Sequence, residues 1–271
     1  MKLRVSPLVW SEFLELLNLG DIISPVEVFF DTNGCAEVRA SDNTKTIQYV
    51  LPTWRLINST VDEEGSVVID PAELYLDNLK FKKSKEITIS ASDGVMVISD
   101  DKGNMLNYYM KDSSAAVTIP KDKTPKFDED DKVLFKKKVK DEEGNESIVQ
   151  GSAESIVKID STQLQLAVND MTKHAKTEYV EFLFSDGANF SKTGHFDTKA
   201  KESTSALLAT LDGNDISFVL PKTFADLIKP LEGEIEIQGA DGSPGVVFKH
   251  SKIGKGDVII VLMRQKVAKT S

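Results

Sequence analysis

The chain has 271 residues, of which 40% are hydrophobic and 28% charged, a composition typical of a soluble globular protein with one large domain or two smaller ones. It carries 33 lysines and arginines against 43 aspartates and glutamates, and the formal net charge of -10 excludes a protein that is basic over its whole surface. The single cysteine, Cys35, excludes an intramolecular disulfide, so we expect a reducing, intracellular location. No apolar run has the length of a signal peptide or a membrane span, and we expect no contact with a membrane.

The first half of the chain contains two helical patterns, each followed by a strand pattern. A first helix is predicted by apolar residues at i, i+3, i+4 and i+7, namely Trp10, Phe13, Leu14 and Leu17. Residues 26–30 then alternate with period two and run into the turn Asn33-Gly34, which predicts a strand. A second helix, with Pro71 in its first turn, is predicted by the same spacing at Ala72, Tyr75, Leu76 and Leu79. The strand 86–89 and the turn 92–94 follow this helix.

The segment between the halves, residues 113–154, has a different character. The stretch 119–125 and the acidic run 128–131 are typical of an exposed polar linker. Residues 132–149 favour an extra hairpin whose lysines protect an exposed strand edge. A connector near forty residues is long for a compact protein, and loops of this length are usually functional or disordered. We expect this connector to lie outside both domain cores.

The second half repeats the first at an offset of about 154 residues. A third helix, with an N-cap at Asp160-Ser161, is predicted by Leu164, Ala167, Val168 and Met171. Residues 180–184 form the next strand pattern and again run into a turn, Asp186-Gly187. A fourth helix, with Pro221 in its first turn, is predicted by Phe224, Leu227, Ile228 and Leu231, before the strand 234–237 and the turn 240–242. Four matching segments in the same order indicate a tandem duplication.

The fold class that follows is α+β. The strands are too closely spaced for parallel crossovers, so each domain is expected to pack two helices on antiparallel sheets. We assign residues 1–112 to an N-terminal domain, 113–154 to the connector and 155–271 to a C-terminal domain.

The sequence offers no set of residues that would make an enzyme. The three histidines, His174, His195 and His250, have no metal-ligand spacing, and Cys35 has no histidine nearby to activate it. The motif Gly254-Lys255-Gly256 lacks the rest of a phosphate-binding loop and is typical of a hairpin turn. We therefore expect no catalytic residues, no metal and no cofactor.

The duplicated pattern resembles the DNA polymerase sliding clamps of the proliferating cell nuclear antigen (PCNA) type, found in eukaryotes, archaea and some phages. The most similar segments are 26–42, 180–190 and 218–231, of which the last resembles the family's final helix entered from a strand. Residues 107–112 are similar to the strand that closes the family's first domain. The likeness covers nearly the whole chain and consists of pattern and order.

The resemblance implies a homotrimeric ring, closed head to tail, that encircles duplex DNA without reading its sequence. Such a ring tethers the replicative DNA polymerase as a processivity factor and is not an enzyme. The implied partners are double-stranded DNA, the polymerase and a clamp loader. The long connector, which departs from the family's usual one, favours a phage or other virus as the source.

The resemblance also implies that basic residues on the helices face DNA phosphates. Seven lysines lie on or beside three of the four helices, namely Lys80, Lys82, Lys83, Lys173, Lys176, Lys222 and Lys229. Helix C-termini favour cations whatever they bind, which is the simpler explanation of these positions. The first helix has no basic residue, since its polar positions are Ser11, Glu12, Glu15 and Asn18.

Two further surfaces are implied. Partner peptides would dock beside the connector, in a groove formed by Ile47, Tyr49, Val117, Ile119, Pro120, Leu262 and Met263. Packing inside a core or a strand explains these seven residues equally well. The subunits would meet strand to strand, with Leu106, Tyr108 and Met110 on one edge and Ala206, Leu207 and Leu208 on the other.

Two alternatives are weighed against the ring. A monomeric viral processivity subunit of the same fold would hold DNA by a basic face, but the acidic total disfavours it because its whole affinity would be electrostatic. A hydrolase or transferase on an α+β scaffold is disfavoured by the missing catalytic residues.

Overall fold

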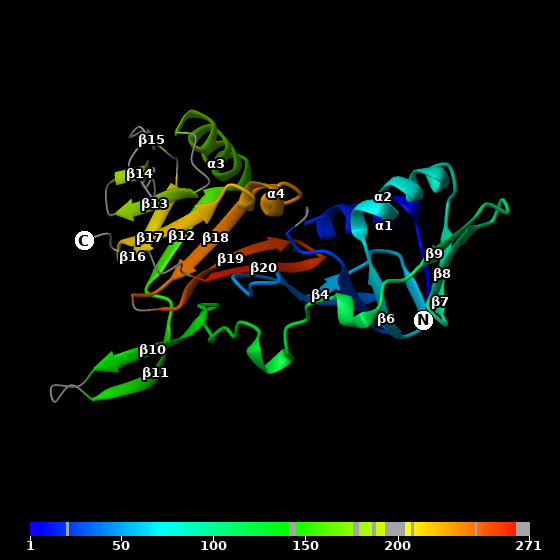
Figure 1. The fold of residues 1–271 in the computed structure, drawn as a ribbon, viewed down its shortest axis with the longest axis horizontal. Helices are drawn as coiled ribbons and strands as arrows, with labels where there is room; N and C mark the ends of the chain where they lie inside the picture. Colours follow the sequence, from blue (N-terminus) through cyan, green and yellow to red (C-terminus); the bar gives the residue numbers. More distant parts are fainter. Residues whose placement is uncertain are drawn as a thin grey trace. The chain divides into compact units, whose positions relative to one another are not determined.

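The computed structural model describes residues 1–19, 22–140, 145–175, 179–185, 188–192, 204–206, 209–241 and 243–263. The chain forms two compact units (Figure 1). Unit 1 comprises Met1–Thr124 and Ser251–Ile259, and unit 2 comprises Pro125–His250 and Ile260–Ser271. The expected connector is thus divided between the units at residue 124.

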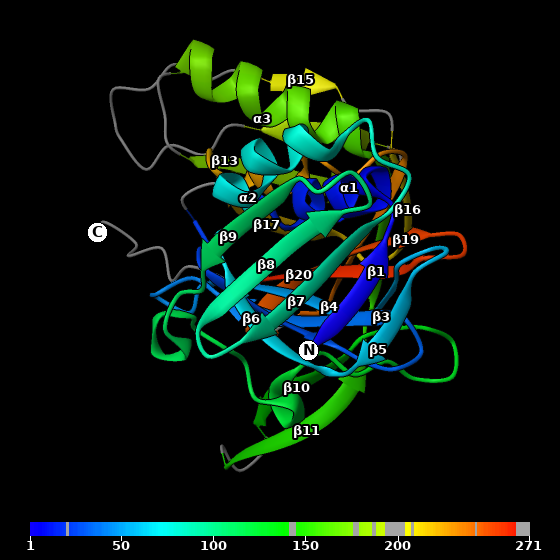
Figure 2. The same cartoon turned by 90° about the vertical axis from the view of Figure 1, so that its right-hand side faces the viewer.

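Unit 1 packs two helices against two antiparallel sheets. Its elements are β1 (Lys2–Val5), α1 (Pro7–Leu17), β2 (Val26–Phe30), β3 (Cys35–Ser41), β4 (Ile47–Arg55), β5 (Thr60–Glu63), β6 (Gly65–Ile69), α2 (Pro71–Asn78), the 3₁₀ helix η1 (Leu79–Phe81), β7 (Ile87–Ser92), β8 (Val95–Asp100), β9 (Met105–Tyr109), and the 3₁₀ turns η2 (Ser113–Ala115) and η3 (Lys121–Lys123). One sheet has the order β5-β1-β7-β8-β9 and is seen face on in Figure 2. The other strands follow the order β4-β3-β2-β6.

Unit 2 repeats this arrangement after an additional hairpin. Its elements are β10 (Leu134–Lys140), β11 (Glu146–Ser152), β12 (Ser155–Asp160), α3 (Ser161–Ala175), β13 (Tyr179–Ser185), β14 (Ala188–Lys192), β15 (Thr204–Ala206), β16 (Ala209–Gly213), β17 (Ile216–Pro221), α4 (Phe224–Ile228), β18 (Glu234–Gly239), β19 (Gly245–Lys252) and β20 (Gly256–Met263). The sheet orders are β16-β12-β18-β19-β20 and β15-β14-β13-β17, with β10 and β11 paired separately.

The two sets of sheets correspond strand by strand. Replacing β1, β5, β7, β8 and β9 by β12, β16, β18, β19 and β20 converts the first sheet order of unit 1 into that of unit 2. The order β4-β3-β2-β6 becomes β15-β14-β13-β17 in the same way, and α1 and α2 correspond to α3 and α4. The predicted tandem duplication and the α+β class are confirmed.

Polar side chains cap the N-termini of α1 and α3. Ser6 precedes α1, and its side-chain oxygen accepts a hydrogen bond from the Val9 N–H at 3.2 Å. Asp160 does the same for α3, accepting from the Thr162 N–H at 2.9 Å. Pro221 was expected in the first turn of the fourth helix, but it ends β17, and α4 begins three residues later at Phe224. The apolar spacing located this helix correctly, whereas the proline marked the preceding strand.

Each unit has its own aromatic core between helices and sheets. In unit 1, Trp10 and Phe13 of α1 pack on Phe30 of β2, with ring centroids 6.2 and 6.0 Å from that ring. In unit 2, Phe182 of β13 stacks on Phe218 of β17 at 5.6 Å. In the sequence, Trp10 and Phe13 belong to the predicted first helix, and Phe30 and Phe182 to the predicted strands 26–30 and 180–184.

The connector contributes to both cores, which differs from our expectation. In unit 1 the Ser41 N–H donates to Val117 O at 2.9 Å and the Ile119 N–H donates to Arg39 O at 3.0 Å, so residues 117–119 lie along β3. In unit 2 the side chains of Val133 and Phe135 are buried. These alternate residues share one face at the base of β10, which explains why they pack inward while the lysines beyond them do not.

Candidate nucleic-acid interface and partner sites

The lysines expected to face DNA lie at helix ends. Those that the structure describes are all exposed, namely Lys80, Lys82, Lys83, Lys173, Lys222 and Lys229. Lys176 lies outside the described residues. Lys80 of η1 forms an ion pair with Asp77 of α2, with Nζ 3.0 Å from Oδ1, so part of its charge is offset.

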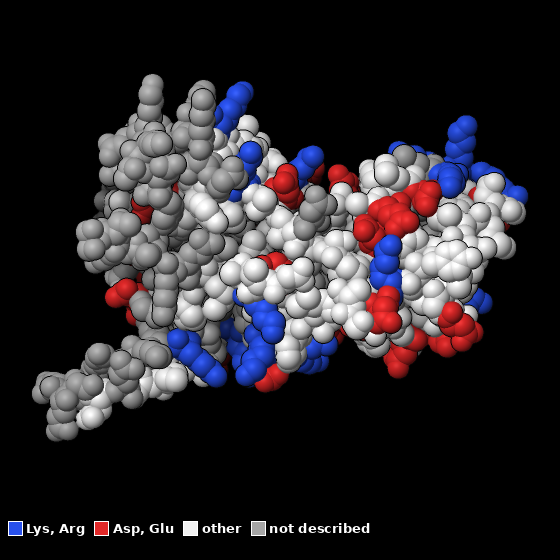
Figure 3. Space-filling view, viewed as in Figure 1, with Lys and Arg blue, Asp and Glu red and all other residues white. Residues whose placement is uncertain are grey.

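A compact group of lysines lies at one end of unit 1, and we call it the lysine cluster. It combines the loop after η1 with the turn between β8 and β9, and consists of Lys82, Lys83, Lys85 and Lys102, all exposed. The two segments are joined directly, because Lys102 Nζ donates to Lys83 O at 2.5 Å and Ser84 Oγ donates to Asp100 Oδ2 at 2.5 Å. Figure 3 shows blue side chains gathered at this end of unit 1.

Asp100 organises the turn that carries Lys102. Its carboxylate accepts hydrogen bonds from the backbone N–H groups of Lys102 and Asn104 at 3.0 and 2.8 Å, and from Asn104 Nδ2 at 2.8 Å. Together with the Ser84 hydroxyl, which has the largest effect, these donors lower the pKa of Asp100 from 3.8 to about 2. The ionised carboxylate therefore fixes the turn, and the turn places Lys102 beside the other three lysines.

Sequence reasoning missed Lys85 and Lys102. Lys102 is 19 residues from Lys83 along the chain, so only the fold brings them together. The signal available beforehand was the turn itself, since Asp100-Asp101-Lys102-Gly103 is a typical hairpin connection.

The exposed face of α1 and α2 is acidic and partly apolar. Glu12 and Glu15 on α1 and Glu73 on α2 are exposed, as are Leu8 and Leu76. A cation from far along the chain reaches α1, because Lys255 Nζ lies 2.5 Å from Glu12 Oε2. The turn Gly254-Lys255-Gly256 thus supplies a basic group to the helix that has none of its own.

The residues expected to form a partner groove are mostly packed in the core. Tyr49 is fully buried, and its hydroxyl donates to Leu16 O at 3.0 Å. Ile47, Ile119 and Leu262 are also buried, Val117 and Met263 are half-buried, and Pro120 is exposed. Leu262 and Met263 belong to unit 2 and the other five residues to unit 1. Tyr49 therefore acts as a core anchor rather than as a contact surface.

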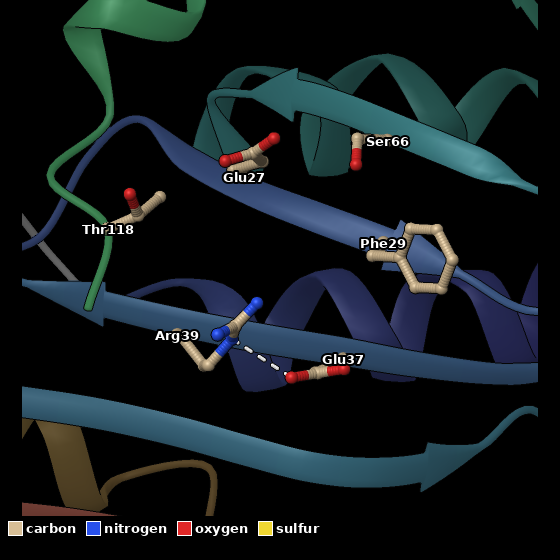
Figure 4. Close-up of a pocket in the computed structure, with 6 residues that line it drawn as sticks. All are labelled: Glu27, Phe29, Glu37, Arg39, Ser66 and Thr118. Atoms are coloured by element: carbon tan, nitrogen blue, oxygen red, sulfur yellow. Dashed lines mark ion pairs between the residues drawn. The ribbon is translucent and has the colours of Figure 1, made fainter. Parts of the chain in front are cut away.

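A shallow pocket of about 280 Å³ lies beside the connector, over β2, β3 and β6 of unit 1. It is lined by Glu27, Phe29, Glu37, Arg39, Ser66 and Thr118. Figure 4 shows these side chains around it, with Arg39 Nε 2.9 Å from Glu37 Oε1 and Thr118 approaching from the connector. None of the six was predicted, although the alternation in β2 and β3 puts these polar residues on one face.

The expected subunit edge of unit 1 is β9, the last strand of its sheet order. Tyr108 points inward, being 5% exposed, and its hydroxyl accepts from the Asp70 N–H at 2.9 Å. Leu106 and Met110 are half-buried, whereas Met105 and Tyr109 are exposed. On the other expected edge, Ala206 ends β15, and Leu207 and Leu208 lie outside the described residues.

Nothing in the described part of the chain groups three or more His, Cys, Asp or Glu residues so that they could hold a metal ion. The helices among those residues are too short or too polar to span a membrane.

No family model and no curated protein matches this sequence. Solved structures do match it along its length. The PCNA of Thermococcus kodakaraensis aligns with a TM-score of 0.66 and 12% identity, over 97% of this chain and 99% of that chain. The proliferating cellular nuclear antigen of Entamoeba histolytica aligns with a TM-score of 0.68 and 9% identity, over 98% of each chain. The A. fulgidus PCNA, solved with the C-terminal region of FEN-1, aligns with a TM-score of 0.66 and 12% identity, over 99% of each chain.

These similarities establish the fold. The chain has the PCNA fold over the 97–99% of its length that aligns, as the resemblance of its duplicated segments implied, at 9–12% sequence identity.

Proposed function

We propose that this chain is a sliding clamp, a non-enzymatic processivity factor that acts on DNA inside the cell. Three copies close into a ring around duplex DNA and tether the replicative DNA polymerase. The observation that carries the proposal is the strand correspondence between the two units, combined with the PCNA fold.

The correspondence supports a head-to-tail ring. Among the described strands, β9 is the last in the order β5-β1-β7-β8-β9 of unit 1, and β15 is the first in the order β15-β14-β13-β17 of unit 2. We propose that β9 of one copy pairs with β15 of a second copy. Such a contact is heterologous, and it closes into a ring when the rotation between copies is a whole fraction of a turn.

The charges suit a clamp that holds DNA by topology. The lysine cluster and the lysines at the ends of α3 and α4 would contact phosphates without reading bases. The acidic residues on α1 and α2 limit the total attraction, so a free monomer would bind weakly. A closed ring needs only weak attraction because it cannot fall off laterally, which disfavours the alternative of a monomeric subunit held by a basic face.

The connector side of unit 1 is the proposed docking region for the polymerase and the clamp loader. Residues 117–119 lie on β3, and the pocket lined by Phe29 and Arg39 is next to them. The A. fulgidus PCNA was solved with the C-terminal region of FEN-1, which supports peptide docking as a property of this fold.

Light scattering on the purified chain tests the ring. We expect the mass of three copies, and we expect Met105→Glu with Tyr109→Glu to give monomers because both side chains are exposed on the β9 edge. Ile253→Glu, a change at an exposed residue in the β19–β20 turn, is the matched control and should leave the trimer intact. A wild-type mass of one chain would favour the monomeric subunit, and a trimer that survives the double change would place the contact elsewhere.

A further inference from the structure

A pocket of about 370 Å³ on unit 2 has no role in the proposed clamp. It lies between the turn at residues 130–132 and the strands β12, β16 and β18 of the same unit. The edge proposed to pair between copies, β15, belongs to the other sheet order of unit 2, so the pocket is distinct from that edge. The charged residues that line it are Asp130, Asp131, Lys132, Lys158, Asp212 and Glu236.

The turn that forms one wall of the pocket is fixed in place. Asp128 Oδ1 accepts hydrogen bonds from the backbone N–H groups of Asp130 and Lys132, at 3.0 and 2.9 Å. The buried side chain of Gln238 then ties the turn to β18, because its Nε2 donates to Asp131 O at 3.0 Å. The wall is therefore preformed, and a ligand would not have to order it on binding.

The strands form the floor of the pocket. The register pairs Ile156 of β12 with Asp212 of β16, and Lys158 of β12 with Glu236 of β18. Residues two apart in a strand face the same side, so these four side chains share one face of the sheet. Ile156 and Leu211 are half-buried and both line the pocket, which makes its floor partly apolar.

The pocket remains acidic when every charge near it along the chain is counted. The four segments that contribute its lining hold eleven aspartates and glutamates against four lysines, and all four segments lie within the described residues. These segments are residues 126–136, 154–160, 209–215 and 232–236. Such an excess of negative charge favours a positively charged partner.

Two of the four lining carboxylates are offset by ion pairs. The buried Lys249 pairs with Asp131. Lys158 Nζ lies 3.8 Å from Glu236 Oε2, and it is shared with Glu234 at 4.0 Å. These pairs explain part of the charge of the pocket and leave the other two carboxylates for a ligand.

Asp130 and Asp212 are exposed and form no ion pair with another described residue. No three acidic, histidine or cysteine residues in the described part of the chain could hold a metal ion together, so the carboxylates do not converge on one cation. A DNA phosphate would be repelled. Arginine and lysine side chains fit the pocket, because their aliphatic stems can lie along apolar surface while their charged heads reach carboxylates.

We propose that this pocket binds a basic segment of a partner protein, which places two arginine or lysine side chains in it. Their aliphatic stems cover Ile156 and Leu211, and their charges face Asp130 on the turn and Asp212 on β16. This inference goes beyond the proposed clamp and does not depend on it.

Fluorescence anisotropy with a labelled peptide of alternating arginines and serines tests the proposal at about 0.15 M salt, where remote charges are screened. The full-length chain should bind this peptide more tightly than a peptide with citrulline, which is neutral and similar in shape, in place of arginine. Asp130→Asn with Asp212→Asn should weaken binding of the arginine peptide about fivefold. Glu64→Gln with Asp101→Asn makes the same change in net charge at exposed residues of unit 1, and this control should have little effect.

A second variant should increase the affinity, which a folding defect would not do. Lys132→Ala removes a cation that competes with the peptide inside the pocket, and it should tighten binding about twofold. Lys121→Ala, at an exposed lysine of η3, makes the same change in net charge and is the control.

The proposal is overturned if the wild-type chain binds the arginine and citrulline peptides equally, or binds neither. It is also overturned if the pocket variants and their controls change the affinity equally, since the peptide would then respond only to the net charge of the chain. A change of oligomeric mass in the double aspartate variant would contradict it as well, because the pocket would then contact a second copy.

Discussion

Tyr108 and Tyr109 are neighbours in β9 with opposite environments. The Tyr108 hydroxyl is packed inside unit 1 and accepts the Asp70 N–H, while the ring of Tyr109 is 76% exposed. Burial is the main cause that raises the pKa of Tyr108. Asp70 in turn caps α2 by accepting from the Ala72 N–H at 3.2 Å, so Tyr108 supports the helix as well as the strand.

Tyr108→Phe should therefore destabilise the protein, whereas Tyr109→Phe should not. The first change leaves the Asp70 N–H without its partner, at a cost of about 1 kcal/mol, which corresponds to a fall of about 2–4 °C in Tm. Thermal unfolding of the two variants measures the difference. Equal Tm values for both variants would show that the Asp70 contact contributes nothing.

Asp100 predicts a pH dependence in the acid range. Its pKa is lowered to about 2 in the folded protein from 3.8, chiefly by the Ser84 hydroxyl, so its ionised form stabilises the fold above pH 3.8. This contribution is lost as the pH falls from about 4 through 2. Asp100→Asn should flatten the acid part of the Tm profile, and Ser84→Ala should flatten it partly. Profiles that coincide with that of the wild type between these pH values would contradict the assignment.

For single residues, the sequence predicted burial better than it predicted which residues contact one another. The apolar spacing located Trp10 and Phe13 in the core, and Lys82 and Lys83 were singled out from their place after a helix. The contacts of Lys102 with Lys83 and of Lys255 with Glu12 join distant parts of the chain, so no local pattern could indicate them. Tyr49 was left open between a groove and the core, because an alternating strand does not reveal which face is buried.

The β10–β11 hairpin has a buried base and an exposed distal part. Val133 and Phe135 are buried in unit 2, whereas the residues from 136 to 150 whose exposure is described lie on the surface. The boundary between the buried base and the exposed part of the hairpin therefore falls inside β10, after Phe135.

Shortening the hairpin should distinguish these roles. Replacing residues 137–149 by a short Gly/Ser turn should leave Tm nearly unchanged, because the buried base remains. Extending the deletion to 133–151 removes a buried valine and a buried phenylalanine and should cost several kcal/mol, about 3–5 for an aromatic residue alone. Thermal unfolding compares the two deletions. A large fall in Tm for the shorter deletion would show that residues 137–149 contribute to the core.

The lysine cluster should control the salt dependence of DNA binding. In the proposed clamp, Lys83→Ala with Lys102→Ala would remove two phosphate contacts, and it should reduce the slope of log affinity against log salt by about 2. The control is Lys121→Ala with Lys123→Ala, a pair of exposed lysines in η3. Titration of a short duplex at several salt concentrations measures both slopes. The same slope in both variants would mean that the cluster is only solvated.

Elements were predictable because the chain repeats itself. Two helical spacings and two strand patterns recur in the same order, and repetition strengthens each assignment beyond what one pattern supports. The start of α4 and the burial of Val133 and Phe135 were missed for a common reason. Proline and lysine indicate local geometry and solvation, and both can lie next to a residue that packs inward.

At the scale of the whole molecule, the net charge of -10 opposes DNA binding by charge alone, so the proposed clamp holds DNA mainly by encircling it. Among the described residues, β9 and β15 each stand at the end of a sheet order, and we propose that these two edges pair between copies. The number of copies and the closure of the ring depend on the angle between neighbouring units, and local sequence patterns carry no information about that angle.

Retention on circular and linear DNA tests the proposed clamp most directly. The wild-type protein is assembled on a nicked circular plasmid at high protein concentration, and free protein is removed by gel filtration at a salt concentration that screens phosphate contacts. We expect the protein to stay on the circle and to leave when a restriction enzyme linearises the plasmid, because a ring can then slide off the ends. Equal loss from circular and linear DNA would show that the chain is held by charge alone and would contradict the clamp.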